Sequence, residues 1–282
     1  MKLTLHSLPT VLVGIVGTAL AIGGMGQEPR QGPLTPPPKR EVKRIPAEPN
    51  PEPPPVPIEQ IIRGFAEKED EFQQGRAKYT YRQAIRVQEF EEDGRLGGEF
   101  QLSSDILFTP DGKRYEKIVR EPPSTLRRTT ISQEDLADWA RIPAFPMTTG
   151  RISKYNLTYL GRQTVDEITT YVFRVQPKQL ERGQPYFEGV IWVDDQDLAI
   201  VKTYGNFVAQ GRAEAQQSFF NLFETYREAV DGKYWFPTYT RADELVKLKS
   251  SEARIRLTIR YSDYKPFQAT AGTKGTESPK PD

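Results

Sequence analysis

The chain of 282 residues contains no cysteine and a single histidine, His6. Disulfides, thiol nucleophiles, Cys/His zinc sites, haem ligation by these residues and imidazole-based triads all require one of the two side chains. His6 lies in a segment that we interpret below as a removed signal, so the mature protein is expected to lack both. These absences favour binding over catalysis, and we expect no enzymatic activity, no cofactor and no metal site.

An excess of charge of either sign is also missing. Lys and Arg number 39 and Asp and Glu 38, which gives a net charge of +1. No basic block stands out, so the electrostatic footprint of nucleic-acid binding is absent, and we expect no nucleic-acid partner. A phosphate-binding loop, a dinucleotide fingerprint and a nucleophile elbow are absent as well.

Long apolar runs are limited to the N-terminus, where residues 1–26 have the pattern of a secretory signal peptide. Lys2 precedes the apolar run Val11 to Ile22, and Ala19-Leu20-Ala21 offers a small-x-small cleavage site. The alternative is an uncleaved inner-membrane anchor through residues 8–25, which nearly reach the ~20 residues that a span needs. Since no cysteine is present, a lipoprotein signal is excluded. The sequence therefore predicts export to the periplasm.

Residues 27–57 form a proline-rich linker that holds half of the chain's 24 prolines. Because proline lacks a backbone N–H group, we expect an extended polyproline conformation that rises ~3.1 Å per residue. Such a linker is either a stalk or groove ligand, or a disordered leader. Residues 268–282 have the composition of a disordered tail.

The central region, residues 58–267, is predicted to be one domain. Residues 57–75 place apolar side chains at helical spacing after a proline, which is typical of an amphipathic helix. A second, short helix is predicted at Ser132-Gln133-Glu134-Asp135, which resembles a capping box. Strand-like alternation marks residues 79–87, 100–108, 115–119, 155–159, 171–175, 190–194, 198–204, 219–226, 234–236 and 253–261.

These segments predict a mainly β (α+β) fold of about 10–11 strands with 2–3 helices. Turn sequences such as Pro110-Asp111-Gly112 and Asp231-Gly232 indicate hairpins between successive strands. In residues 253–261 apolar and basic side chains alternate, which is typical of an antiparallel sheet with one wet face. We expect a single strongly curved antiparallel sheet, or incomplete barrel, with helices on its concave side. A β-sandwich is the rival, but strands this long favour one curved sheet.

Aromatic and aliphatic stripes along the strands have two interpretations. They are either an ordinary core, or the lining of an apolar cavity between sheet and helices that is open to acyl chains. On the second interpretation, the candidates for cavity residues are Tyr79, Tyr81, Ile85, Phe100, Leu102, Ile106, Phe108 and Trp192.

Three polar patterns are weighed against simpler interpretations. Asp194-Asp195-Gln196-Asp197 offers oxygen ligands for calcium but sits where a hairpin turn is expected. The basic residues of 254–260 are either an anionic docking face or the wet side of the sheet. Nothing in the sequence pairs the carboxylates that acid/base chemistry would need. The candidates considered for that role are Asp105, Glu116, Asp166 and Glu188, and a solvated face is the favoured interpretation.

One segment carries a family resemblance. Residues 187–204, Phe-Glu-Gly-Val-Ile-Trp-Val-Asp-Asp-Gln-Asp-Leu-Ala-Ile-Val-Lys-Thr-Tyr, resemble the outer-membrane lipoprotein-sorting protein family, called LolA-like. The order of signal, amphipathic helix and Tyr-rich strands is similar too, as is Phe-Pro after the hairpin at Gly232. The resemblance covers residues 58–267 and is close to an uncharacterised acidobacterial group.

The resemblance implies an incomplete antiparallel barrel lidded by helices, and a periplasmic carrier or binding protein for an apolar or acyl ligand. Sorting of lipoproteins to the outer membrane is the carrier role of such proteins, so lipoproteins are implied as partners in outer-membrane biogenesis. Other proteins of this fold act as sensors or binding modules. The alternative function is therefore a non-catalytic cell-envelope interaction or sensor module, tethered by the proline-rich leader and bound to envelope proteins.

Overall fold

A computed structural model describes residues 48–109, 113–142, 145–209, 220, 222–247 and 252–267. The predicted signal, residues 27–47 of the predicted linker, the predicted tail and the expected turn at residues 110–112 lie outside the described residues. Among the residues that are described, no helix has both the length and the apolar character to cross a membrane. The segment 8–25, considered above as an anchor, is not among them.

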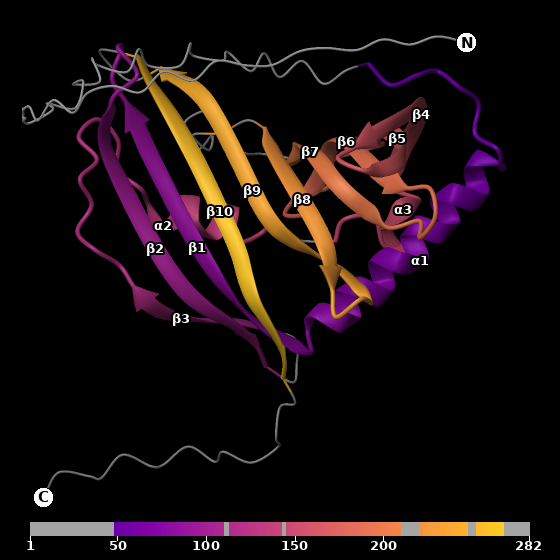
Figure 1. The fold of residues 1–282 in the computed structure, drawn as a ribbon, viewed down its shortest axis with the longest axis horizontal. Coiled ribbons are helices and arrows are strands. Elements are labelled where there is room, and N and C mark those ends of the chain that lie inside the picture. The colour runs from indigo at the N-terminus through magenta and orange to yellow at the C-terminus, as the bar shows by residue number, and fades with distance from the viewer. Residues whose placement is uncertain are drawn as a thin grey trace, which may run out of the picture. The chain divides into compact units, whose positions relative to one another are not determined.

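The described strands form a single antiparallel sheet of ten strands (Figure 1). The sheet order is β3-β2-β1-β10-β9-β8-β7-β6-β5-β4, so the N-terminal hairpins join the C-terminal strand through the β1–β10 pair. Since β3 and β4 stand at opposite ends of this order, the sheet is not closed into a barrel. The strands are β1 (Tyr79–Phe90), β2 (Leu96–Phe108), β3 (Arg114–Arg120), β4 (Tyr155–Val165), β5 (Ile168–Pro177), β6 (Tyr186–Asp194), β7 (Ile200–Val208), β8 (Phe223–Val230), β9 (Tyr234–Lys247) and β10 (Glu252–Pro266).

Three helices lie in the described part of the chain: α1 (Ile58–Arg76), α2 (Gln133–Trp139) and α3 (Thr149–Ile152). The predicted amphipathic helix is present, and Pro57, expected in its first turn, is its N-cap residue. The predicted capping box of α2 is present, with the Ser132 hydroxyl and the Asp135 carboxylate each bonded to the other residue's backbone N–H group. The predicted fold class, a mainly β protein with one open antiparallel sheet and few helices, is confirmed.

The helices cover one face of the sheet in two places. Ile61 and Phe65 of α1 pack with apolar residues of β4, β5, β6 and β7, and the two ring centroids of Phe65 and Phe173 lie 5.8 Å apart. Trp139 of α2 is fully buried among residues of β1, β2 and β10. The core therefore lies between this face and the helices.

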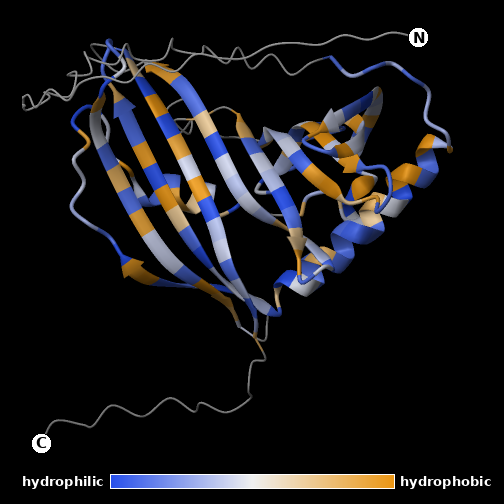
Figure 2. Cartoon of the chain, viewed as in Figure 1, coloured by the Kyte–Doolittle hydropathy of each residue, from blue (hydrophilic) through white to orange (hydrophobic). Residues whose placement is uncertain are grey.

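Alternation along the strands decides which side chains reach that core. In β10 the predicted inward set, Ala253, Ile255, Leu257, Ile259 and Tyr261, is buried. Figure 2 shows hydrophobic and hydrophilic residues alternating along β1, β2 and β10. Edge strand β3 differs, because Tyr115, Ile118 and Val119 remain 48–58% exposed.

The residues that precede α1 lie against the outer edge of β4. Asn50 and Arg162 exchange two backbone hydrogen bonds of 2.8 Å, and the Tyr159 hydroxyl donates to the Glu52 carbonyl at 3.0 Å. Gly161 permits this approach, because a Cβ atom there would lie 2.0 Å from the Asn50 oxygen. The last residues of the predicted linker thus cover a backbone edge that would otherwise be open to pairing.

Candidate functional site

The eight cavity candidates from the sequence fall into three groups. Six of them pack together with Trp139 of α2: Tyr81, Ile85, Phe100, Leu102, Ile106 and Phe108. Tyr79 lies in a neighbouring cluster with Phe72 and Phe236. Trp192 packs with Val172 and Val201 instead, on the face of β6 opposite to its neighbours Ile191 and Val193, which lie in the α1 cluster. The fold therefore separates Trp192 from the other seven.

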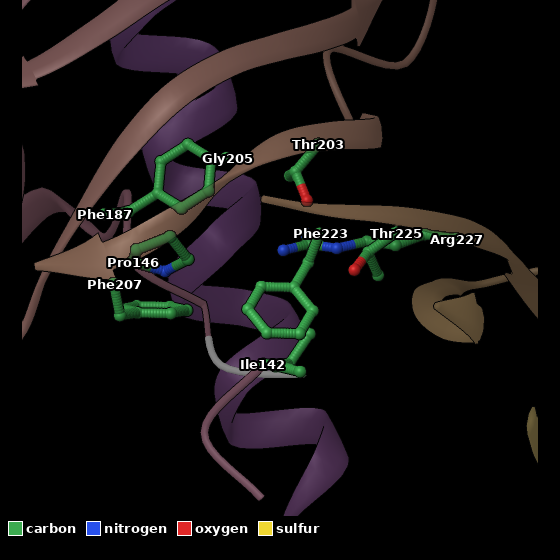
Figure 3. Close-up of a pocket in the computed structure, with 9 residues that line it drawn as sticks. All are labelled: Ile142, Pro146, Phe187, Thr203, Gly205, Phe207, Phe223, Thr225 and Arg227. Carbon is green, nitrogen blue, oxygen red and sulfur yellow. The ribbon is translucent and has the colours of Figure 1, made fainter. Parts of the chain in front are cut away.

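A pocket in the described residues lies on the helix-covered face at β6, β7 and β8 (Figure 3). It has a volume of about 360 Å³, counting the solvent at its mouth. The nine residues that line it include none of the eight candidates. They are Ile142, Pro146, Phe187, Thr203, Gly205, Phe207, Phe223, Thr225 and Arg227.

Strand alternation and one glycine pair form this pocket. Residues 203, 205 and 207 of β7 share one face, and Thr203 and Gly205 are paired with Thr225 and Phe223 of β8. Gly205 is paired with Gly189 across β6 and β7. A Cβ atom on Gly205 would lie 2.2 Å from the Glu188 oxygen and 2.8 Å from the Phe187 ring, so only glycine fits beneath that ring.

The walls of the pocket are aromatic, and its polar groups come from β7 and β8. Figure 3 shows the rings of Phe187, Phe207 and Phe223 around the space, with the Thr203 hydroxyl directed into it. The Thr225 hydroxyl shares a hydrogen bond of 2.9 Å with Thr240. The pocket is thus an apolar surface with a small set of neighbouring polar groups, the usual composition of small-molecule sites.

Arg227 is the charged member of the lining. Its Nη1 atom donates to Glu69 of α1, and the two side chains are only 2% and 1% exposed. Its guanidinium carbon also lies 4.7 Å from the centroid of the Phe145 ring. A buried ion pair therefore joins the pocket to the covering helix.

The polar patterns considered from the sequence lie elsewhere. Residues 194–199 form the expected turn, in which the Asp194 backbone N–H and carbonyl bond Ala199 and Leu198. Burial raises the pKa of Asp194 above its usual value. Asp195 pairs with Arg162. The described residues hold no group of three or more His, Cys, Asp or Glu side chains suited to a metal ion.

Two arginines on the basic face of β10 share one carboxylate. Arg254 and Arg256 both donate to Asp243 of β9, at 2.8 Å each. Arg260 lies over the Tyr239 ring, 5.6 Å from its centroid. These contacts favour the wet side of a sheet over an anionic docking face.

The four carboxylates considered for acid/base chemistry lie on three strands and in one turn. Asp105 on β2 pairs with Arg82, and Glu116 on β3 pairs with Arg114. Asp166 lies in the turn between β4 and β5, at a φ of 52°, and Glu188 is exposed on β6. Two of the four are thus engaged by arginines.

Two tyrosines of the core around Phe236 predict a loss of stability in alkali. A hydrogen bond to Asp231 and burial raise the pKa of Tyr79 to about 12, and burial raises that of Tyr264. Because an unfolded tyrosine ionises near pH 10, stability is full below that pH and falls as the pH rises towards 12. The midpoint of urea denaturation should fall between pH 9 and pH 11, and this fall should be smaller in Tyr79→Phe than in the unchanged protein. An equal fall in the two proteins would contradict this assignment.

No family model and no curated protein matches this chain. Among solved structures, a DUF1329 family protein from Desulfovibrio piger is 15% identical, with 77% of this chain and 95% of that chain covered at a TM-score of 0.37. A LolA superfamily protein from Nitrosomonas europaea is 17% identical, with 76% and 96% covered and a TM-score of 0.35.

A third structure, a putative outer membrane lipoprotein-sorting protein domain from Vibrio parahaemolyticus, is 10% identical, with 74% and 94% covered and a TM-score of 0.33. TM-scores of this size carry no argument about what this chain binds or does. Two of the three structures are described as LolA superfamily or lipoprotein-sorting proteins, the family that the sequence resemblance named, while the acidobacterial grouping stays a prediction.

Proposed function

We propose that this protein is a carrier or binding protein for an apolar or acyl ligand, which it holds in the pocket of β6, β7 and β8. The observation that supports this most directly is the group of three phenyl rings, Phe187, Phe207 and Phe223, around a hollow with few polar groups. We also propose a periplasmic location and a non-catalytic role, with lipoprotein sorting to the outer membrane as the carrier activity.

The size of the pocket limits what it holds. The enclosed space is about 10 Å³, room for about one water molecule, against roughly 300–1,000 Å³ for typical small-molecule pockets. We therefore expect the rings of Phe187, Phe207 and Phe223 to move apart when the end of an acyl chain enters. Each methylene that is then removed from water contributes about 0.8 kcal/mol.

Native mass spectrometry of the purified full chain, before and after lipid extraction, tests this function. The expected result is an added mass of lipid size that extraction removes, and that a single-chain acyl compound restores. A bare mass in every sample, with no uptake of the acyl compound, would overturn the proposal.

A specific observation supports the second candidate, an envelope interaction module. Six of the residues predicted to line a cavity fill the core between β1, β2, β10 and α2. In that case the domain would bind a partner through its surface. The bare mass described above, together with capture of an envelope protein, would favour this candidate.

A further inference from the structure

We propose that the outer backbone edge of β4 is a pairing site for a second copy of this chain, and that residues 48–52, which we call the guard, block it. When the guard is displaced, the β4 strands of two copies pair antiparallel across a twofold axis and join the two sheets. This surface does not line the pocket, and the inference is independent of the ligand proposed above.

The guard is attached to β4 by few contacts. Asn50 exchanges two backbone hydrogen bonds with Arg162, and the Tyr159 hydroxyl donates to the Glu52 carbonyl. Among the residues that the structure describes, no other backbone hydrogen bond joins residues 48–57 to β4. Six of these ten residues are proline, which has no N–H group and cannot continue a ladder. One backbone bridge therefore holds the guard in place, and we expect it to be displaced easily.

The first half of β4 has a composition that edge strands usually avoid. Residues 155–159, Tyr-Asn-Leu-Thr-Tyr, contain no charge and no proline. Open edges of this kind pair with other chains, and proteins protect them with charges, bulges, proline or a covering segment. The opposite edge strand, β3, carries such protection itself, because Lys117 and Arg120 are exposed on it and its register with β2 is irregular. The β4 edge depends on the guard instead.

The same five residues are complementary to themselves. In an antiparallel pair centred on Leu157, Tyr155 lies opposite Tyr159 of the second copy, and Asn156 lies opposite Thr158. The register with β5 places residues 155, 157 and 159 on the core face and residues 156 and 158 on the outer face. Each pair therefore joins side chains on one face, as a twofold axis normal to the sheet requires. Aromatic, aliphatic and amide–hydroxyl pairs result, with no like charges opposed, so a second copy fits this edge.

Sedimentation velocity of the full chain at a series of concentrations tests the guard. Asn50→Pro removes the N–H group of the bridge, and the side chain that it replaces is exposed. The unchanged protein should be a monomer, whereas Asn50→Pro should form a dimer whose share rises with concentration. A dimer of the unchanged protein, or an Asn50→Pro variant that stays monomeric throughout, would overturn the proposal.

Two matched changes, each added to Asn50→Pro, test the register. Asn156→Lys/Thr158→Lys places like charges opposite each other twice, whereas Asn156→Glu/Thr158→Lys places opposite charges there. Both side chains are exposed, so the folded monomer should be retained, which circular dichroism checks. The two lysines should weaken the dimer by about tenfold or more, and the glutamate–lysine variant should keep it. A dimer that the two lysines leave intact would lie at another surface and would overturn the assignment to β4.

Discussion

Replacing Arg227 by methionine is expected to lower the free energy of unfolding by about 3–5 kcal/mol, because it leaves the Glu69 carboxylate buried without its partner. The side chain of Glu69 is 1% exposed, and its Oε2 atom has no hydrogen-bond partner among the described residues. Urea denaturation followed by circular dichroism measures the change.

The matched control is the double variant Glu69→Leu/Arg227→Met, in which both charges are replaced by apolar side chains of similar volume. Replacing a whole buried ion pair in this way is often neutral or even stabilising. The double variant should therefore be more stable than Arg227→Met alone. A double variant that loses as much as the sum of the two single changes would show that Glu69 and Arg227 act independently.

Replacing Glu89 by leucine is expected to remove a set of buried hydrogen bonds. The free energy of unfolding should fall by about 3–5 kcal/mol in total. Glu89 of β1 is fully buried, and its carboxylate accepts the backbone N–H groups of Arg127, Arg128 and Thr129. The Thr129 hydroxyl donates to it as well, at 2.6 Å. In Glu89→Leu these donors lose their acceptor, and the segment between β3 and α2 loses its attachment to the sheet.

Glu89→Gln is the comparison, because the side-chain carbonyl oxygen of glutamine still accepts some of these hydrogen bonds. The free energy of unfolding should therefore fall less in Glu89→Gln than in Glu89→Leu. Burial opposes ionisation of Glu89, but the bonds from Thr129 and the three N–H groups hold its pKa below the usual value of 4.5. The stabilisation is therefore present above pH 4.5 and is lost as the pH falls through the lower folded pKa. Equal losses for leucine and glutamine, or a Glu89→Gln variant that loses the same stability on acidification as the unchanged protein, would contradict this account.

Local patterns were sufficient for most of the fold. The alternation in residues 253–261 predicts the buried face of β10, because a strand has a side-chain period of two. The Ser132 capping box likewise predicts the start of α2, since its hydrogen bonds span only three residues. Both features depend on neighbours in the sequence, and both are present in the structure.

The pocket depends on pairings that no local pattern contains. It forms where Gly189 meets Gly205 and where Thr203 meets Thr225, and these contacts depend on the register of β6, β7 and β8. The Glu69–Arg227 pair joins positions 158 residues apart. Alternation in residues 203–207 would have placed Thr203, Gly205 and Phe207 on one face, but it does not show which strand lies beside them.

The position of Trp192 likewise could not be predicted from local sequence patterns. It belongs to an aromatic stripe in the sequence, yet a strand sends successive side chains to opposite faces, and the residues on either side of it face α1. On the outer face its ring lies 4.8 Å from the Lys202 ammonium group. Separating Trp192 from Tyr79 and Phe108 requires the register of β6, which only the structure supplies.

The ligand content of the protein tests the central claim most directly. Native mass spectrometry is applied to the unchanged chain, to Thr203→Phe, which fills the pocket, and to Thr258→Phe, a matched change on the outward face of β10. We predict a removable lipid-sized mass on the unchanged chain and on Thr258→Phe, and its loss in Thr203→Phe. An adduct that persists in Thr203→Phe, or none on the unchanged chain after incubation with the acyl compound, would contradict the assignment of this pocket.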